Sequence, residues 1–451
     1  MDIDGLRTGL NKIRDYTERN GADAAFFRVL EGLKEWADDR SYSREVLMLP
    51  ETGDTETKES GFFLSVIIPV YSPDMDDFAH LLDSLLRQTY TDFEVVIADG
   101  SADTAIENVV KVYDGDPDVH LLIKYERLKE NLGISGNTNE ALKRAEGDYV
   151  VFIDHDDFIE PDALLETVKA IKEGAELIYT DEDKYDGVRD RYFCPNRKPD
   201  FNLDLLLSNN YICHMLTVRK DLVEKAGGFR SGYDGAQDHD LLLRLSEIIP
   251  REKTAHIPKI LYHWRLSENS TAGNPESKVY AYDNGKKAVE DYFSRRGIGA
   301  SVHHTSHRGF FRADYSGAEA AEDSCRIFVD RSLQSLTPGY EKLLRGYFAR
   351  EEVGIVGAAI IGKSGRTVSN GYTKLPDGTR TAEYGKIDYR FSGYMHRAHM
   401  IRETEAVSAH AFAIRKELLD TVSRDVFHMC GRVRERGFSV IVDPNIIFKL
   451  R

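Results

Sequence analysis

FFLSVIIPV (62–70) is an unbroken run of apolar and β-branched residues, a pattern typical of a strand buried on both faces of a sheet. Three similar runs follow it along the chain: FEVVIADGS (93–101), HLLIKYER (120–127) and DYVVFIDHDD (148–157). Helical patterns separate these runs, and strands that alternate with helices predict a parallel sheet with right-handed crossovers. Ligands of such sheets bind beyond the carboxyl ends of the strands. The polar residues that end these runs are therefore the first site candidates.

We predict an α/β fold, a Rossmann-like and mostly parallel sheet flanked by helices, with further segments at both ends. Residues 1–60 are expected to form a helical segment followed by a polar linker, and residues 61–317 the main domain. Residues 318–451 are expected to form a smaller α/β domain with strands in 324–333 and 353–362. CHMLTVRKDLV (213–223) and AHAFAIRKELL (409–419) share their pattern, which indicates that the second domain is a degenerate, partial repeat of the first.

The composition excludes several classes of protein. Lys and Arg number 60 and Asp and Glu number 76, so the net charge of −16 argues against a nucleic-acid-binding chain. No stretch offers the roughly 20 apolar residues that cross a bilayer, and the N-terminus lacks the apolar core of a secretory signal. The four cysteines lie far apart. We therefore expect a cytoplasmic protein with reduced cysteines.

Three carboxylates follow the fourth strand, in Asp154-His155-Asp156-Asp157. Carboxylates this close repel one another unless a cation lies among them. Asp154 and Asp156 are two residues apart in a turn, where both can face one divalent ion, and oxygen ligands suit Mg²⁺ or Mn²⁺. Helix capping is the alternative, but one aspartate suffices for a cap. The pattern predicts a metal site.

A second acidic site precedes the helical pattern LLLRLSEI (241–248). Asp238 stands at its start, where a carboxylate can either cap the helix or act as a general base toward an incoming hydroxyl. Further along, LYHWRLSENSTA (261–272) carries His263 and Arg265. An imidazole can complete a metal shell and a guanidinium can pair with a diphosphate, although ordinary hydrogen bonding is the default for a lone histidine on a strand.

These acidic and basic groups together indicate the displacement of a diphosphate leaving group. Neither a Walker A segment nor a GxGxxG after a strand is present, which argues against ATP hydrolysis and dinucleotide binding.

Residues 64–272 resemble a family 2 glycosyltransferase with the GT-A fold. The resemblance rests on motifs that occur in order: SVIIPVY (65–71), SLLRQTY (84–90), FEVVIADGS, ENLGISGNTNEAL (130–142), GDYVVFIDHDD (147–157), LIYTDEDK (177–184), AGGFR (226–230), QDHDLLLRL (237–245) and YHWR (262–265). The subgroup that it resembles contains bacterial enzymes of surface-polysaccharide assembly, including rhamnosyltransferases.

The resemblance implies a role for each matching position. The residues that it places against the nucleotide sugar are Pro69, Val70, Tyr71, Asp99, Asn131, Gly133, Asn137, Asp154 and Arg265. It makes Asp156 and His263 metal ligands and Asp238 the catalytic base, although the glutamate that usually precedes this base is replaced by Gln237. The residues expected near the acceptor or the sugar are Asp181, Glu182, Asp183, Gly228 and Trp264. For the three acids, an exposed acidic turn is the alternative.

The sequence thus predicts an inverting, Mn²⁺- or Mg²⁺-dependent glycosyltransferase. We expect a UDP- or dTDP-sugar as donor, a hydroxyl of a glycan or lipid-linked saccharide as acceptor, and a role in cell-surface or cell-wall polysaccharide synthesis, with peripheral membrane association through a lipid-linked acceptor. One alternative is a non-catalytic carbohydrate-binding or scaffold protein with a degenerate GT-A fold. Another is a sugar-phosphate nucleotidyltransferase, but its first strand should lead into a Gly-rich basic segment, whereas VYSPDMDD (70–77) is acidic.

Overall fold

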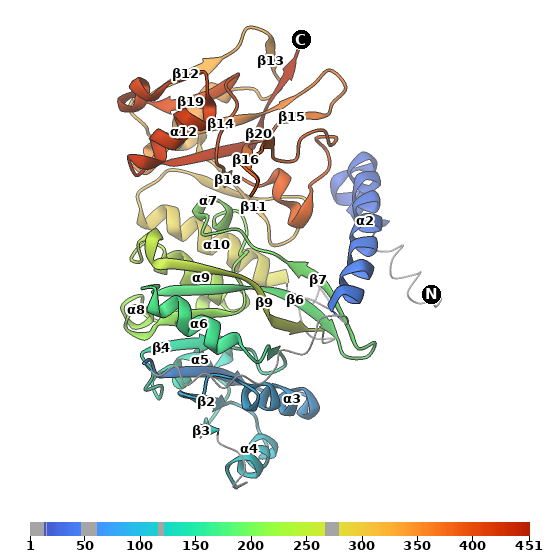
Figure 1. The fold of residues 1–451 in the computed structure, drawn as a ribbon, viewed down its shortest axis with the longest axis vertical. Helices are drawn as coiled ribbons and strands as arrows, with labels where there is room; N and C mark the ends of the chain where they lie inside the picture. The colour runs from blue at the N-terminus through green and yellow to red at the C-terminus, as the bar shows by residue number, and fades with distance from the viewer. Residues whose placement is uncertain (1–12, 15, 47–60, 116–120, 267–278) are drawn as a thin grey trace. The chain divides into compact units, whose positions relative to one another are not determined.

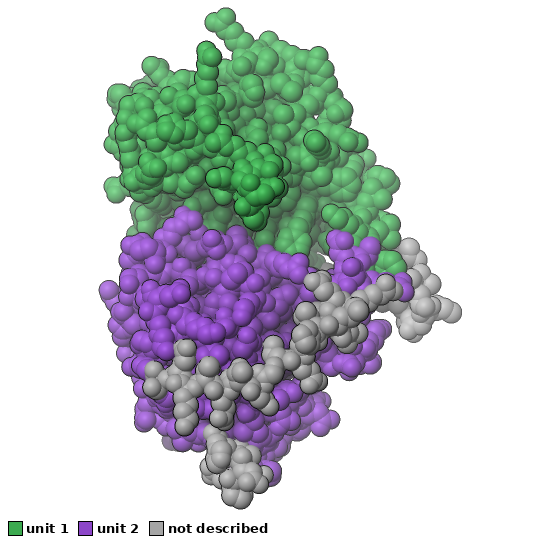
Figure 2. Space-filling view, viewed as in Figure 1, with its two compact units in different colours: residues 1–36, 202–209, 289–451 green, residues 37–201, 210–288 purple. Residues whose placement is uncertain are grey.

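A computed structural model describes residues 13–14, 16–46, 61–115, 121–266 and 279–451. The chain forms two compact units, which are coloured separately in Figure 2. Unit 1 comprises residues 1–36, 202–209 and 289–451, and unit 2 comprises residues 37–201 and 210–288. These units group the chain differently from the expected segments, so the boundaries at residues 60 and 317 stay predictions.

The described part of unit 2 contains a nine-stranded sheet in the order β3-β2-β1-β4-β8-β6-β9-β5, with β7 paired to β6 (Figure 1). Its strands are β1 Leu64–Val70, β2 Phe93–Asp99, β3 Leu122–Arg127, β4 Tyr149–Phe152, β5 Phe158–Ile159, β6 Leu177–Asp186, β7 Arg191–Asn196, β8 Leu216–Arg219 and β9 Thr254–Arg265. The helices of unit 2 are α3 Met75–Leu86, α4 Ala105–Gly115, α5 Gly133–Leu142, α6 Ala163–Lys172, α8 Lys220–Lys225 and α9 Gln237–Leu245.

The four strands predicted from apolar runs are confirmed, and β1, β2, β3 and β4 run parallel. Every residue of β1 and β2 is buried, as the unbroken apolar pattern predicts. Helix α3 begins after Asp74, whose side chain accepts hydrogen bonds from the backbone of Asp76 and Asp77, and its leucines pack into the same core. The other half of the sheet is mixed, because β8 runs antiparallel to both β4 and β6.

Unit 1 contains a second sheet, in the order β12-β19-β14-β20-β13 with β15 and β18 at its margins. Its strands are β12 Cys325–Val329, β13 Leu333–Ser335, β14 Val353–Ile361, β15 Thr367–Ser369, β18 Arg402–Glu403, β19 Ala411–Arg415 and β20 Ser439–Leu450. Two hairpins, β10 Ser301–His304 with β11 Phe311–Asp314 and β16 Tyr372–Lys374 with β17 Arg380–Ala382, and the helices α7 Leu203–Leu206, α11 Tyr340–Gly346 and α12 Val426–Glu435 complete it. The predicted α/β class is confirmed for this part of the chain as well.

Two helices continue across the division between the units: α2 Ala22–Val46 and α10 Val279–Arg295. Helix α2 is longer than its apolar pattern indicates, and the expected linker at residues 50–60 lies outside the described residues. Among the helices that the structure describes, none combines the length and the apolar character that crossing a membrane requires.

Candidate active site

A cavity in unit 2 lies at the ends of β1 and β4, where the parallel half of the sheet predicts a site. The residues that line it come from six separate segments and are Pro69, Ile134, Thr138, Phe152, Ile153, Asp154, Cys213, His214, Leu216, Phe229, Gln237 and Asp238. Asp154 and Asp238, which are 84 positions apart in the sequence, therefore line the same cavity.

Asp154 lies beside His214, a residue that the sequence did not single out. The reason is the antiparallel pairing of β4 with β8, in which Phe152 lies opposite Leu216. Two residues further along each strand, the same register places Asp154 opposite His214, and Asp154 Oδ2 is 3.8 Å from His214 Nε2. Only the position of His214 just before an apolar run could have pointed to it, and that signal does not reveal which strand is its neighbour.

Asp154, Asp157 and His214 form a group whose ligand atoms all lie within 4.8 Å of one another. Asp157 is fully buried, and its carboxylate accepts hydrogen bonds from the Tyr262 hydroxyl and from the backbone N–H of Arg265 at 2.8 Å. Burial raises its pKa well above the ordinary carboxyl value, and the charges of Asp156 and Asp154 raise it further.

The pKa of Asp156 is raised as well, first by burial and also by the charge of Asp154, although His155 acts in the opposite direction. Clustered carboxylates whose charged forms are disfavoured are the arrangement that a divalent cation relieves, and a neutral imidazole beside them can serve as a further ligand. The donor set in this cavity therefore fits a divalent metal ion.

Asp238 is half-buried at the start of α9, and a neighbouring amide fixes it in place. Asn210 donates a hydrogen bond from Nδ2 to Asp238 Oδ2 at 2.6 Å, while its own Oδ1 accepts from the backbone N–H of Cys213 at 3.3 Å. The same amide thus links the carboxylate to the segment that carries His214.

The segment that carries His214 rests on a buried ion pair. Glu182 Oε2 accepts a hydrogen bond from the His214 backbone N–H at 3.1 Å and lies 3.2 Å from Lys198 Nζ. Lys198 also donates to the carbonyl oxygens of Ile212 and His214. Glu182 and Lys198 therefore fix the position of the His214 backbone through its N–H and its carbonyl oxygen.

Asp181, Glu182 and Asp183 do not form the exposed acidic turn that the sequence allowed. They belong to β6 itself, and all three are at most 6% exposed. Their charges are compensated inside the unit, since Asp181 Oδ1 lies 2.8 Å from His256 Nε2 and Asp183 Oδ1 lies 2.6 Å from His263 Nδ1. These buried, paired acids stabilise the sheet, and their contact with a sugar or an acceptor stays a prediction.

His263 does not join the group around Asp154, contrary to the ligand role expected from the sequence. Its second ring nitrogen lies 3.0 Å from Glu160 Oε1, so both nitrogens face carboxylates, and the residue is 3% exposed. Burial works to lower its pKa, but Asp183 and Glu160 outweigh this and raise the pKa to about 9. A protonated imidazole has no lone pair for a metal ion.

The side chain of Arg265 is buried against the acidic turn and is held there by hydrogen bonds within the protein. It is 6% exposed, its Nε donates to the carbonyl oxygen of Asp156 at 3.0 Å, and the same nitrogen lies 3.1 Å from Asp77 Oδ1. Its neighbour Trp264 has its ring 5.9 Å from the His214 ring, which places the indole at the margin of the acidic group.

Of the residues expected to contact the base of a nucleotide, Pro69 lines the cavity and Tyr71 is 53% exposed, whereas Val70 and Asp99 are buried in the sheet. The carboxylate of Asp99 accepts hydrogen bonds from the Ser101 backbone and the Tyr125 hydroxyl, both at 2.8 Å. In this structure, Asp99 therefore shapes the turn after β2.

The segment 131–137 is tied together by its own amides. Asn131 Oδ1 accepts hydrogen bonds from the Gly133 backbone at 3.0 Å and from Asn137 Nδ2 at 3.1 Å. Gly133 has φ +75°, and a Cβ there would lie 2.7 Å from Asp234 Oδ2, so the start of α5 requires glycine. Gly228 has φ +66°, and a Cβ there would lie 2.7 Å from Asn139 Oδ1. Gly228 directly precedes Phe229, which lines the cavity.

Comparison with known proteins identifies the family of part of this chain. Residues 65–227 match the family described as glycosyl transferase family 2. An uncharacterized protein, y4gI, of Sinorhizobium fredii is 38% identical over 244 residues, which are 52% of this chain and 26% of that protein. The O-antigen biosynthesis protein RfbC of Myxococcus xanthus is 33% identical over 241 residues, 53% of this chain and 18% of that protein.

Among solved structures, S. aureus TarS is similar over 52% of this chain and 43% of its own, with a TM-score of 0.39 and 22% identity. The chain spans about a quarter or less of the length of the two relatives above. The family match at residues 65–227 includes the acidic turn Asp154–Asp157. The chain therefore contains a glycosyl transferase family 2 domain at residues 65–227.

Proposed function

We propose that this protein transfers a sugar from a UDP- or dTDP-sugar to a hydroxyl group of a glycan or lipid-linked saccharide, with inversion at the anomeric carbon. The observation that carries the proposal is the shared cavity of Asp154 and Asp238, which brings a candidate metal-binding acid and a candidate base to one place. The O-antigen role in the name of the Myxococcus relative supports a polysaccharide acceptor. The cytoplasmic location and peripheral membrane association expected from the sequence stay predictions.

Asp238 is the base in this proposal. Asn210 donates a hydrogen bond to one carboxylate oxygen of Asp238. This bond orients the carboxylate in the cavity that Asp238 lines. The proton of the acceptor hydroxyl moves to Asp238, the acceptor oxygen bonds to the anomeric carbon, and the bond from that carbon to the diphosphate oxygen breaks. A general base in this position contributes about 10²–10⁴ in rate. A direct displacement of this kind inverts the configuration.

The residues that would hold a divalent ion are Asp154, Asp157 and His214, with Asp156 next to them as the ligand expected from the sequence. When bound, such an ion supplies positive charge that stabilises the departing diphosphate. Tyr262 and the backbone of Arg265 orient Asp157, and Glu182 orients the backbone of His214. The protein's own contribution is to hold these ligands in place before the donor arrives.

Asp238→Asn tests the proposal directly. The amide cannot accept the proton, so we expect transfer to fall below about 1% of wild type while nucleotide binding is retained. Transfer is followed by release of UDP or dTDP from a panel of nucleotide sugars, and binding is followed by thermal shift with and without Mn²⁺. Glu173→Gln, an exposed acid in the same unit, serves as the matched control.

Wild-type turnover by Asp238→Asn would remove the base assignment, and full activity in EDTA would remove the metal. Binding of nucleotide sugars by the wild-type protein without any turnover would instead favour the non-catalytic alternative.

A further inference from the structure

A strip of basic and aromatic side chains lies on one face of β7, β6 and β9, which are neighbouring strands of unit 2 (Figure 1). In the strand register, Lys184 of β6 lies between Phe193 of β7 and Trp264 of β9. Arg191 is two residues from Phe193 on β7, so its side chain emerges on the same face. All four residues, here called the basic strip, are partly exposed, and three neighbouring strands are about 10 Å across.

The basic strip adjoins the candidate active site. The ring of Trp264 has its centroid 5.9 Å from that of His214, which lines the cavity of unit 2. Trp264 is also on the same face of β9 as Tyr262, whose ring stacks on the His214 ring with centroids 4.7 Å apart. Because Asp238 lines the same cavity, a saccharide with its hydroxyl at this carboxylate can continue over the indole onto the strip.

The two cations of the strip lie over aromatic rings. Lys184 Nζ is 5.2 Å from the centroid of the Trp264 ring. The guanidinium carbon of Arg191 is 5.5 Å from the centroid of the Phe193 ring. Within the described part of the chain, neither cation forms an ion pair with a carboxylate. Their positive charge therefore stays available to an anionic ligand.

The acids of the β6–β7 hairpin have other partners. Glu182 Oε2 is 3.2 Å from Lys198 Nζ. Asp186 Oδ2 is 2.7 Å from Nη1 of Arg189. Asp190, in the turn, accepts a hydrogen bond from a tyrosine hydroxyl at 2.8 Å. The strip is thus a site of positive charge in a chain whose net charge is −16.

This combination of side chains suits a ligand with both sugar rings and negative charge. Aromatic rings suit the C–H faces of sugars, and ammonium and guanidinium groups form stronger hydrogen bonds with carboxylate or phosphate oxygens than with neutral hydroxyls. The donor also carries a diphosphate, but its base is expected at β1 and β2, and the strip lies on the other side of β4 and β8. The acceptor is therefore the substrate that fits the strip.

We propose that the basic strip binds the acceptor of the transferase, and that this acceptor is a saccharide with an anionic group, a carboxylate or a phosphate. The inference rests on the proposed transferase function and names the class of its acceptor. The negative charge of the whole chain repels such a saccharide, and the two cations of the strip provide local attraction beside the site.

Calorimetric titration of the full chain without donor tests the proposal. The ligands are uronic-acid oligosaccharides with their carboxyl-reduced forms, and phosphate-bearing oligosaccharides with their dephosphorylated forms, so that the two pairs distinguish the two anions. We expect one charged set to bind about tenfold or more tightly than its neutral form, with an affinity that falls as salt is added. Lys184→Met and Arg191→Met should each weaken this binding about tenfold, whereas Lys184→Arg should retain it.

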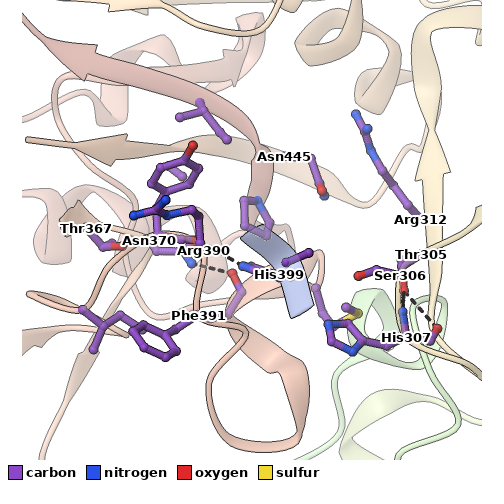
Figure 3. A pocket seen from close by; sticks show the side chains of 18 of the residues that line it. Thr305, Ser306, His307, Arg312, Thr367, Asn370, Arg390, Phe391, His399 and Asn445 are labelled. Atoms are coloured by element: carbon purple, nitrogen blue, oxygen red, sulfur yellow. Dashed lines mark hydrogen bonds between the residues drawn. The ribbon is translucent and has the colours of Figure 1, made fainter. Parts of the chain in front are cut away.

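Arg312→Met is the matched control. Arg312 belongs to unit 1, lines the cavity shown in Figure 3 and has no carboxylate partner in the part of the chain that the structure describes. Its replacement removes the same charge from the chain at another place, so this variant should bind like wild type. The thermal shift that UDP and Mn²⁺ produce should be the same in all four variants, because the strip is not expected to contact the donor.

Equal affinity for the charged and the neutral forms would overturn the proposal, as would binding that is unchanged in both Lys184→Met and Arg191→Met. A tenfold loss in Arg312→Met would overturn it too, since net charge alone would then explain the effect. Equal kcat/KM for transfer to charged and neutral acceptors overturns the acceptor class and leaves the transferase function intact. Binding of a charged oligosaccharide without release of nucleoside diphosphate from any donor instead contradicts the transferase function and supports the preference of the strip.

Discussion

The two sheets of this protein share one strand order but not one chemistry. In unit 2 five neighbouring strands have the order β4-β8-β6-β9-β5, and in unit 1 the order is β12-β19-β14-β20-β13. If the five strands of each sheet are numbered as they occur along the chain, the two orders are identical. The directions agree as well, because the second strand of each order runs antiparallel to both neighbours and the next pair is parallel. The similar stretches 213–223 and 409–419 fall on β8 and β19 with the residues around them. This agreement supports the degenerate repeat, which stays a prediction.

The correspondence extends to one pair of side chains. In unit 1, Phe328 lies opposite Phe412, and two residues beyond this pair are Asp330 and His410. Asp330 Oδ2 is 3.5 Å from His410 Nδ1, as Asp154 lies beside His214 in unit 2. An aspartate–histidine pair at this register is thus common to both sheets.

The other acids are found in one sheet only. After Asp330 the chain continues Arg331-Ser332-Leu333, where unit 2 has His155, Asp156 and Asp157 after Asp154. Leu333 and Phe448, both buried in unit 1, occupy the positions that Asp157 and Tyr262 hold in unit 2. The comparison teaches that the strand order requires only apolar packing, whereas the charge cluster depends on a few replaceable side chains.

The most direct test of this difference removes the corresponding aspartate from each sheet. Asp154→Asn deletes a charge from the carboxylate group, and we expect kcat to fall about 10²–10³-fold. Asp330→Asn should leave kcat within about twofold, since Ser332 and Leu333 provide no second acid. Both are measured as release of nucleoside diphosphate. Equal losses in the two variants would mean that both sheets take part in the reaction.

The second prediction concerns pH and a histidine specific to unit 2. The pKa of His263 is raised from 6.5 to about 9, so the folded state binds its proton more tightly than the unfolded state. Its contribution, at most about 3 kcal/mol, is complete below pH 6.5 and is lost as the pH rises to 9. Urea unfolding at pH 6.5, 7.5 and 9 measures it, and His263→Gln should lack this part of the pH dependence. An identical pH dependence in wild type and variant would contradict the assignment.

A third experiment converts one sheet toward the other. Tyr262→Phe removes the hydroxyl that hydrogen-bonds Asp157 and should lower the free energy of unfolding by about 1–3 kcal/mol. Adding Asp157→Leu recreates the apolar pair of unit 1 and should recover part of that stability, while abolishing any response of activity to Mn²⁺. Urea midpoints and metal titrations provide the two readouts. A double variant less stable than Tyr262→Phe would show that the two environments differ in more than this pair.

The smallest effect is expected at the aspartate–histidine pair of unit 1. About half of each side chain of Asp330 and His410 is exposed, at 46% and 52%, and such exposed pairs contribute little. His410→Ala should therefore change the free energy of unfolding by less than about 0.5 kcal/mol, measured by urea unfolding. A loss above 1 kcal/mol would assign this pair a structural role.

Part of the site could be predicted because it depends on local pattern. Asp154 and Asp238 were recognised from their positions at a strand end and a helix start, and the cavity brings them together. The pairing of Asp183 with His263 could not be predicted, since the two residues are 80 positions apart in the sequence. They meet only because β6 and β9 are neighbours in the sheet. From the sequence alone, buried acids with basic partners cannot be distinguished from an exposed acidic turn.

The sequence alone determined the buried parallel strands, the α/β class and the family of residues 65–227, because apolar runs and short motifs are local properties of the chain. Tertiary structure decided which imidazole lies beside Asp154. The strand β8 enters the sheet between β4 and β6, out of sequence order, and its antiparallel register brings His214 to the acidic turn. Strand neighbours and register are set by packing of the whole unit, so no stretch of sequence records them by itself.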